Sequence, residues 1–152
     1  KETGMKNIFP SYKLTLVREK DNQYEVDNVI NNPKDIEAIA RNVLQIDKNA
    51  EEVVCILALN IKNKVEATFE VSRGTVNASL ISPRDIFKRL LLLNVPKFIT
   101  IHNHPSGNTE ASYNDIQLCK CLNECGVIMN IKQVDFCIIG KDINSFKENG
   151  LY

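Results

Sequence analysis

A short, almost entirely apolar run, EVVCILALN at Glu52 to Asn60, constrains the fold of this chain more than any other feature. A strand whose successive side chains are apolar is buried on both faces, which requires a layer of structure on each side of it. The next run, KVEATFEVSRG from Lys64, alternates apolar and polar residues and is typical of a strand with one covered face. The two runs flank a polar turn at Asn60 to Asn63, so they predict a hairpin. TVNASLI, from Thr75, predicts a further extended piece.

Three other stretches carry helix start signals. NPKDIEAIARNVLQI, from Asn32, and SPRDIFKRLLLLN, from Ser82, each place a capping residue before a proline at the first helical position. SYNDIQLCKCLNECG, from Ser112, predicts a third helix, and we expect it to end at Gly126. KFITIHNH, which follows Pro96, predicts a strand between the second and third helices. Because strands and helices alternate in this half of the chain, we expect an α/β fold with helices packed on a mixed sheet.

Length and charge bound the class of protein. A chain of 152 residues with 43% hydrophobic residues is long enough for one domain with a core and too short to expect two. We assign residues 26–152 to this domain and residues 1–25 to an N-terminal extension, in which YKLTLV at Tyr12–Val17 alternates like a strand. Nineteen basic residues balance nineteen acidic ones, so no net charge attracts nucleic acid or an anionic membrane. No apolar run approaches the roughly 20 residues of a membrane span, and the polar start KETGMKN does not resemble a signal peptide, so we expect a cytoplasmic protein.

The chain has five cysteines, an odd number that argues against a disulfide framework. Cys119, Cys121 and Cys125 lie close together, but they form no C-x-x-C pair. We interpret them as free thiols. The alternative is a second site for a metal or for redox chemistry.

His102 and His104 are the only two histidines of the chain, and one residue separates them. Side chains two apart on a strand point to the same side, so both imidazoles would face one way while Asn103 faces the other. Such a pair offers two nitrogen ligands to one metal ion. Pro105 favours an extended His104 and then turns the chain, which ends the strand at this point. The pair therefore predicts a metal site at the end of a strand.

Asp115 is the candidate for a third ligand. Two histidines and one carboxylate leave a fourth position of a tetrahedral zinc for water, which is typical of a catalytic site. The stretch SYND, from Ser112, is also a capping box, in which Ser112 caps the helix and Asp115 occupies its third position. Both functions can share one helix start, because a helix N-terminus favours an anionic group.

These residues together resemble a known metalloprotease motif. His102-x-His104 followed by Ser112-x-x-Asp115 matches H-x-H-x7-S-x2-D, the motif of the JAMM (JAB/MPN) superfamily. The blocks EVSRGTVNAS, SPRDIFKRL and HNHPSGN resemble its RadC-like branch, which was named for a supposed role in DNA repair. The similarity extends from about Ile36 to the C-terminus and so covers most of the chain.

The resemblance implies a fold, a cofactor and a set of functional residues. The implied fold is a three-layer mixed β-sheet with helices on both sides, similar to that of cytidine deaminases. His102, His104 and Asp115 would bind Zn2+. A glutamate on an earlier strand would act as general acid/base and the motif serine would stabilise the oxyanion; by position these residues match Glu70 and Ser112. The implied activity is hydrolysis of a peptide or isopeptide bond, in a peptide or protein substrate, by a metal-activated water.

The identity of the general base stays open between Glu70 and Glu66. Strand periodicity places both side chains on one face of KVEATFEVSRG. The spacing from Glu70 to Gly74 is what matches the family. For each glutamate, the alternative is a solvent-exposed residue on an amphipathic strand.

Three related functions lack their signatures here. A nucleobase deaminase needs H-x-E followed by P-C-x-x-C, and neither occurs. An HNH nuclease spreads its motif residues over a ββα hairpin, whereas the letters HNH are contiguous in this chain. RadC-like proteins often carry an N-terminal helix-hairpin-helix region, but residues 1–23 are too short and too strand-like for one. The sequence therefore does not support direct binding of nucleic acid.

Two functional hypotheses remain. The first is a zinc-dependent hydrolase, which the complete motif favours. The second is a non-catalytic interaction module of a DNA-repair or mobile-element complex that keeps the fold. The oligomeric state is open, because short edge strands at Tyr12–Val17 and at the C-terminus could pair between subunits.

Overall fold

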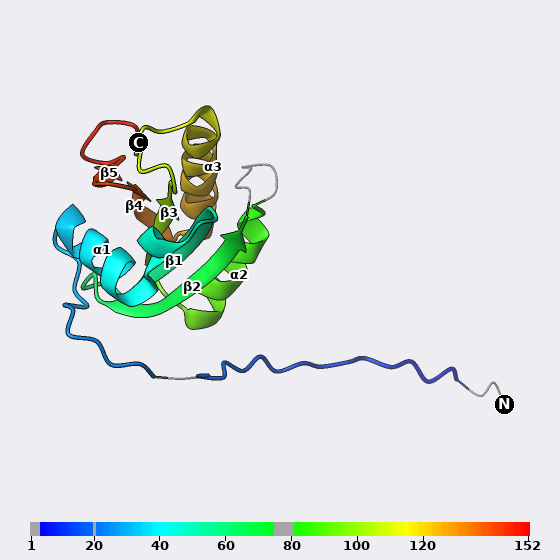
Figure 1. The fold of residues 1–152 in the computed structure, drawn as a ribbon. Helices are drawn as coiled ribbons and strands as arrows, with labels where there is room; N and C mark the ends of the chain where they lie inside the picture. Colours follow the sequence, from blue (N-terminus) through cyan, green and yellow to red (C-terminus); the bar gives the residue numbers. More distant parts are fainter. Residues whose placement is uncertain (1–3, 20, 75–80) are drawn as a thin grey trace.

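A computed structural model describes residues 4–19, 21–74 and 81–152 of the chain (Figure 1). In these residues, five strands form one sheet: β1 (Val53–Leu59), β2 (Val65–Arg73), β3 (Lys97–Asn103), β4 (Lys132–Ile139) and β5 (Ile143–Ser145). Three α-helices accompany them: α1 (Pro33–Ile39), α2 (Pro83–Leu93) and α3 (Tyr113–Met129). A π-helical segment, Ala40–Leu44, and a short 3-10 helix, Ile46–Lys48, follow α1. The extended piece predicted at TVNASLI lies outside the described residues except for Ile81.

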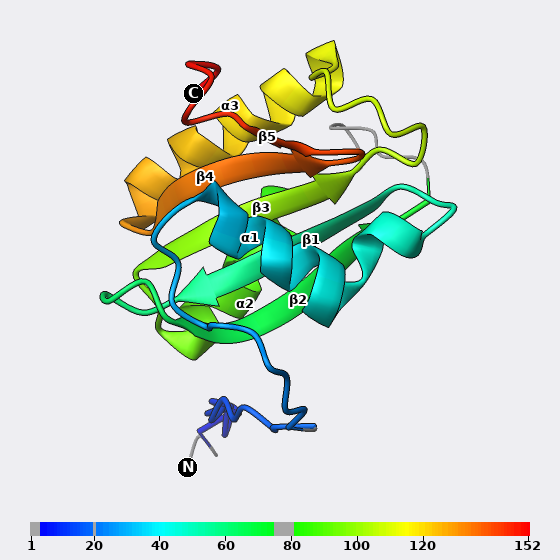
Figure 2. The same cartoon turned by 60° about the vertical axis from the view of Figure 1, so that its left-hand side comes forward.

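The sheet is mixed, with strand order β2-β1-β3-β4-β5. β1 pairs antiparallel with both β2 and β3, whereas β3 and β4 are parallel and β5 returns antiparallel to β4. Parallel neighbours need a crossover connection, which α3 provides between β3 and β4 (Figure 2). The C-terminal end of β3 and the start of α3 therefore lie at the same end of the sheet.

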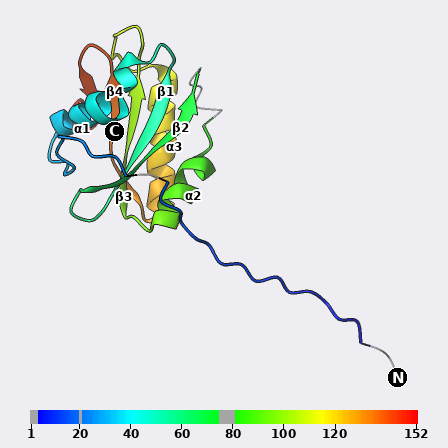
Figure 3. The same ribbon diagram turned by 60° about the horizontal axis from the view of Figure 1, so that its bottom comes forward.

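β1 is buried along its whole length because its two faces pack against different layers. Val54 and Ile56 belong to an apolar cluster with side chains of α2 and α3, whereas Cys55 and Leu57 belong to a second cluster with side chains of α1. Figure 3 shows α1 on one side of the sheet and α3 on the other. The three-layer fold and the central, fully buried strand expected from the sequence are confirmed.

The hairpin and the positions of the three helix starts follow the sequence, but the side chain of Ser82 makes no capping hydrogen bond at the start of α2. Asn32 caps α1 and Ser112 caps α3, each within a complete capping box. Gly126 does not end α3, which continues to Met129 and stops at Asn130 in a left-handed conformation. Gly126 is needed for packing instead, since a Cβ there would lie 2.4 Å from the carbonyl oxygen of Ile131.

The N-terminal segment does not form the strand that its alternation predicts. Tyr12–Val17 is exposed and has no sheet partner in the described part of the chain. An alternating segment forms a strand only when a neighbouring edge accepts its backbone hydrogen bonds, so the pattern alone is insufficient. The nearest link to the sheet is an isolated antiparallel bridge between Val29 and Lys64.

The five cysteines are free thiols, as expected from their number. Burial raises the pKa of both Cys55 and Cys119 to about 12, which keeps these thiols protonated and unreactive. The group of described residues able to hold a metal ion contains no cysteine.

Candidate metal centre

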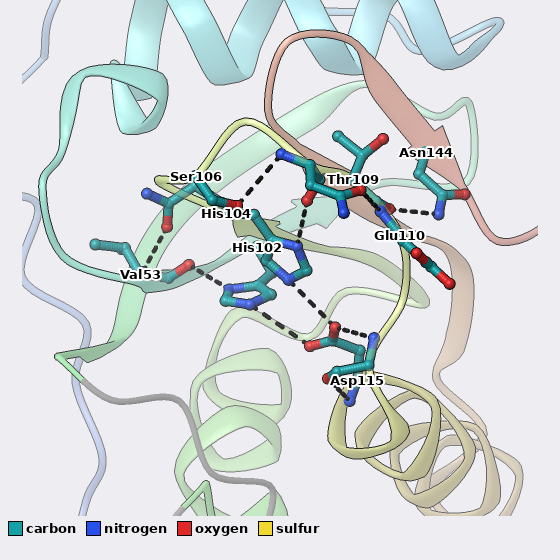
Figure 4. Close-up of polar contacts among 11 residues, drawn as sticks. Val53, His102, His104, Ser106, Thr109, Glu110, Asp115 and Asn144 are labelled. Carbon is teal, nitrogen blue, oxygen red and sulfur yellow. Dashed lines mark hydrogen bonds and ion pairs between the residues drawn. The ribbon is translucent and has the colours of Figure 1, made fainter.

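His102 and His104 stand at the C-terminal end of β3, and a backbone carbonyl orients each ring (Figure 4). His102 Nδ1 lies 3.1 Å from the oxygen of Val53, and His104 Nδ1 lies 2.7 Å from the oxygen of Asn108. A ring nitrogen facing a carbonyl oxygen must donate a proton, so Nδ1 is the protonated nitrogen of each neutral ring. The lone pairs are then on the two Nε2 atoms. Metal-binding histidines are oriented by the same kind of contact at their other nitrogen.

Asp115 faces both Nε2 atoms from the first turn of α3. Its Oδ1 lies 3.5 Å from His102 Nε2, and its Oδ2 lies 3.2 Å from His104 Nε2. Only 3% of Asp115 and 1% of His102 is exposed. The structure therefore brings together the three side chains that the sequence predicts as ligands, although they come from two different elements.

Burial and these contacts set the charges of the group. Burial lowers the pKa of His102 and favours its neutral ring. The hydrogen bond to Asp115 raises the pKa of His104. Burial alone would raise the pKa of Asp115, but hydrogen bonds from His104 and Ser112 outweigh it and lower this pKa. When His104 is protonated, the metal-free chain thus holds His104 and Asp115 as a charge-assisted pair, and a bound cation would replace the proton between them.

Ser112 connects this group to the helix start. Its Oγ accepts a hydrogen bond from the backbone N–H of Asp115 at 3.1 Å, and its own N–H donates to Asp115 Oδ2 at 2.8 Å. The predicted capping box is therefore present, and the same carboxylate also faces the histidines. The two interpretations of this stretch are compatible.

Glu52 is a second carboxylate beside the histidines, and the sequence reasoning missed it. One carboxylate oxygen of Glu52 and one ring nitrogen each of His102 and His104 all lie within 4.8 Å of one another, close enough to hold a metal ion. Glu52 directly precedes β1, and the antiparallel pairing of Val54 with His102 places the start of β1 beside the end of β3. Glu52 is two residues before Val54, so it continues the row of β1 side chains that faces α2 and α3.

Glu70, the expected general base, lies on the opposite face of the sheet. Its partner in the β1–β2 register is Cys55, whose side chain packs in the cluster with α1. Arg73 binds both carboxylate oxygens of Glu70, at 2.6 Å through Nε and at 3.0 Å through Nη2. These hydrogen bonds lower the pKa of Glu70. Glu70 therefore does not lie beside the histidines, where the predicted general base would have to stand.

Glu66, the alternative base, also lies away from the histidines. Asn60 Nδ2 donates a hydrogen bond to Glu66 Oε1 at 2.8 Å, at the hairpin between β1 and β2. His102 pairs with the other end of β1. One signal in the sequence points to Glu52 instead: it stands in the same alternating row as Val54, directly before the most buried strand.

The loop after His104 is fastened to β5 and to the turn before it. Thr109 Oγ1 donates to Asp142 Oδ1 at 2.9 Å, and Asn144 Nδ2 donates to the carbonyl oxygen of Thr109 at 2.7 Å (Figure 4). These contacts hold the loop that carries Asn108, and the oxygen of Asn108 orients His104. The ring is thus positioned before any ligand arrives.

The donor atoms suit a metal ion. Imidazole nitrogens and a carboxylate oxygen are ligands for zinc and for related transition metals. His102, His104 and Asp115 could supply three ligands, while Glu52 stands beside the histidines as a fourth group or as a base for a water molecule. The arrangement therefore fits a metal ion that keeps one coordination position open for a water molecule or a substrate.

Comparison with known proteins gives the family. The model of the RadC-like JAB domain matches residues 30–151. A UPF0758 protein of Clostridium botulinum strain Alaska E43 is 38% identical over 125 residues, which cover 82% of this chain and 54% of that relative. A UPF0758 protein of Clostridioides difficile is 40% identical over 121 residues, which cover 79% of this chain and 51% of that relative. The chain thus spans about half the length of these relatives.

Within the described residues, no helix is both long and apolar enough to cross a membrane. The family match covers the whole sheet and all three α-helices, together with the residues of the candidate metal centre. The chain therefore belongs to the RadC-like JAB domain family, within the JAMM superfamily.

Proposed function

We propose that this chain is a zinc-dependent hydrolase that cleaves a peptide or isopeptide bond by means of a metal-activated water. The observation that carries the proposal is the convergence of His102 Nε2, His104 Nε2 and the Asp115 carboxylate, with Glu52 beside them. A structural zinc site is closed by four protein ligands, whereas three ligands and a neighbouring base are typical of hydrolysis.

Each residue has a defined function in this proposal. His102, His104 and Asp115 would hold Zn2+, which when bound would lower the pKa of a water ligand to about 7 and polarise a carbonyl group. Glu52 takes a proton from the attacking water and passes it to the leaving amine nitrogen. An amide needs this second step because an unprotonated amine is a poor leaving group.

Ser112 stabilises the negative charge that forms on the carbonyl oxygen. Its Oγ accepts a hydrogen bond from the Asp115 backbone, which uses a lone pair and leaves the hydroxyl proton for donation. Ser112 is exposed beside the metal ligands, so a substrate carbonyl can approach it. One such donor contributes about 10²- to 10³-fold to the rate of comparable reactions.

Exchange of a single carboxylate tests the proposal. We expect Glu52→Gln to reduce hydrolysis of a peptide library by about 10²- to 10⁴-fold, because glutamine cannot accept the proton. Glu70→Gln is the matched control, since its carboxylate pairs with Arg73 on the other face of the sheet. Circular dichroism and zinc content of both variants would verify the fold and the metal.

Two results would contradict the proposal. Equal activity of Glu52→Gln and the wild type would show that Glu52 is not the general base. A loss of activity confined to Glu70→Gln would assign this function to Glu70. If no substrate is cleaved by the zinc-loaded wild type, the non-catalytic interaction module becomes the better description.

A further inference from the structure

Tyr12–Val17 is an exposed segment with the pattern of a strand. Tyr12, Leu14 and Leu16 alternate with Lys13 and Thr15, so the apolar side chains would share one face of an extended chain. The exposed fractions of Tyr12, Leu14 and Leu16 are 86%, 78% and 54%. Neighbouring exposed apolar side chains of this kind are typical of a surface that contacts another protein, a membrane or a ligand.

β2 offers a free strand edge in the described structure. It is the first strand in the sheet order, so its outer backbone groups face away from β1. Only its beginning is paired on that side among the described residues: Val65 N–H donates to the oxygen of Asn28 at 2.8 Å, beside the bridge between Val29 and Lys64. Beyond Val65, the edge can accept another strand.

We propose that Tyr12–Val17 of a second copy of this chain adds to β2 as an antiparallel sixth strand, and that two copies exchange these segments to form a dimer. Tyr12 then lies opposite Val71, Leu14 opposite Phe69, and Leu16 opposite Ala67. The proposal concerns assembly and does not depend on the proposed hydrolase activity.

The side chains of β2 favour this register. Ala67, Phe69 and Val71 are partly buried against the cluster of α2 and α3, and Leu14 and Leu16 would extend the same apolar face. A shift by one residue would turn the apolar side chains to the other face. In the proposed register that other face pairs Thr15 with Thr68 and brings Lys13 to Glu70, which are favourable cross-strand partners.

The described chain favours a second copy as the source of the strand. A bend at Glu25 and Val26 directs the N-terminal segment away from its own sheet, and the segment extends beyond the domain (Figures 1 and 3). Among the described residues, each chain therefore presents both an unpaired extended segment and an unpaired strand edge that match. When two copies exchange these segments, each segment pairs with the β2 edge of the other copy, and the result is a closed dimer with two-fold symmetry.

Sedimentation velocity and amide hydrogen exchange on the full chain test the proposal. We expect a dimer of twice the chain mass, and Leu14→Lys/Leu16→Lys should make it monomeric. Ile8→Lys/Phe9→Lys is the matched control, because it removes two similarly exposed apolar residues and adds the same charge before Pro10. This control should remain dimeric.

Hydrogen exchange locates the contact. Outward amides of β2 should exchange at least about tenfold faster in Leu14→Lys/Leu16→Lys than in the wild type. A monomeric wild type would overturn the proposal: protected β2 amides would then show pairing within one chain. A dimer whose protection lies at another surface, or a control variant that also dissociates, would overturn the assignment to β2.

Discussion

Below the raised pKa of His104, His104 and Asp115 carry opposite charges in the metal-free chain, so their contribution to stability depends on pH. The raised pKa of His104 means that its stabilisation is complete below about pH 6.5 and is lost as the pH rises through the raised value. The lowered pKa of Asp115 means that its stabilisation is complete above about pH 4 and is lost as the pH falls through the lowered value. The pair is therefore most favourable between about pH 4 and pH 6.5.

Comparison of the metal-free wild type with His104→Gln measures this effect. We expect the difference in free energy of unfolding to be larger at about pH 5.5 than at about pH 8.5, because the raised pKa of His104 makes the pair stabilising on the acid side. The lowered pKa of His102 acts in the opposite direction, but both proteins contain this residue. Urea unfolding in the presence of a chelator gives the values. An equal difference at both pH values would contradict the pairing.

At this scale, the sequence predicted that His102, His104 and Asp115 lie close together, but it did not predict the position of Glu52 beside them. His102 and His104 are local neighbours and Asp115 lies in a recognisable helix start, so spacing along the chain was sufficient. The position of Glu52 depends on which strand lies beside β3, and spacing does not contain that information. Irregular pairing between Val54 and Cys55 also alters the β1–β2 register near Glu70.

Among the elements, the loop after β3 is the part that positions His104. Gly140 lies so close to this loop that a Cβ would be 2.5 Å from the carbonyl oxygen of Gly107 and 2.8 Å from Thr109 Cγ2. Such a contact cannot be relieved without moving the backbone. The loop and the β4–β5 turn therefore form one packed unit.

Two glycine substitutions separate the effect of this unit from general stability. We expect Gly140→Ala and Gly126→Ala each to reduce the free energy of unfolding by about 1–3 kcal/mol, because each forces backbone to move. Only Gly140→Ala should also weaken zinc binding, by about 10- to 100-fold, because Gly126 lies at the other end of α3. Isothermal titration with zinc checks this. Equal zinc affinity of the two variants would contradict the claim that the loop after β3 positions His104 for metal binding.

Element types were predictable here, whereas some element ends were not. Capping boxes at Asn32 and Ser112 are local, so the starts of α1 and α3 followed from the sequence. Gly126 has the residue type of a helix end but is retained for its contact with Ile131. That contact joins α3 to the start of β4, which sequence patterns do not reveal.

On the scale of the molecule, the core is built without the metal. Two apolar clusters cover the two faces of the sheet and contain most of the buried strand residues. The candidate metal centre lies at one end of this sheet, where the start of β1, the end of β3 and the start of α3 meet. The metal is therefore expected to add stability to a fold that already exists.

Thermal unfolding with and without zinc tests this expectation. The chelated protein should unfold cooperatively, and free zinc at 100 times its dissociation constant should add about 2.7 kcal/mol. This corresponds to an increase in Tm of about 5–10 °C for a domain of this size. His102→Ala/His104→Ala should show no increase. A chelated protein without a cooperative transition would show that the fold requires the metal.

The three-layer architecture was predictable because it depends on β1 and on the alternation of strands and helices. The lack of a sheet partner for Tyr12–Val17 among the described residues was not, since a strand pattern does not identify its neighbour. The structure thus differs from the sequence prediction at the N-terminal segment and at Glu70 for the same reason: both predictions depend on which strand lies beside a given strand.

The central claim is that His102 and His104 bind a metal together with Asp115. Metal content by inductively coupled plasma mass spectrometry tests it most directly, with the untagged wild type measured beside His102→Ala/His104→Ala after zinc reconstitution. We predict one zinc per wild-type chain and none in the variant. A wild-type chain that binds no metal after reconstitution, or a variant that keeps it, would contradict the claim.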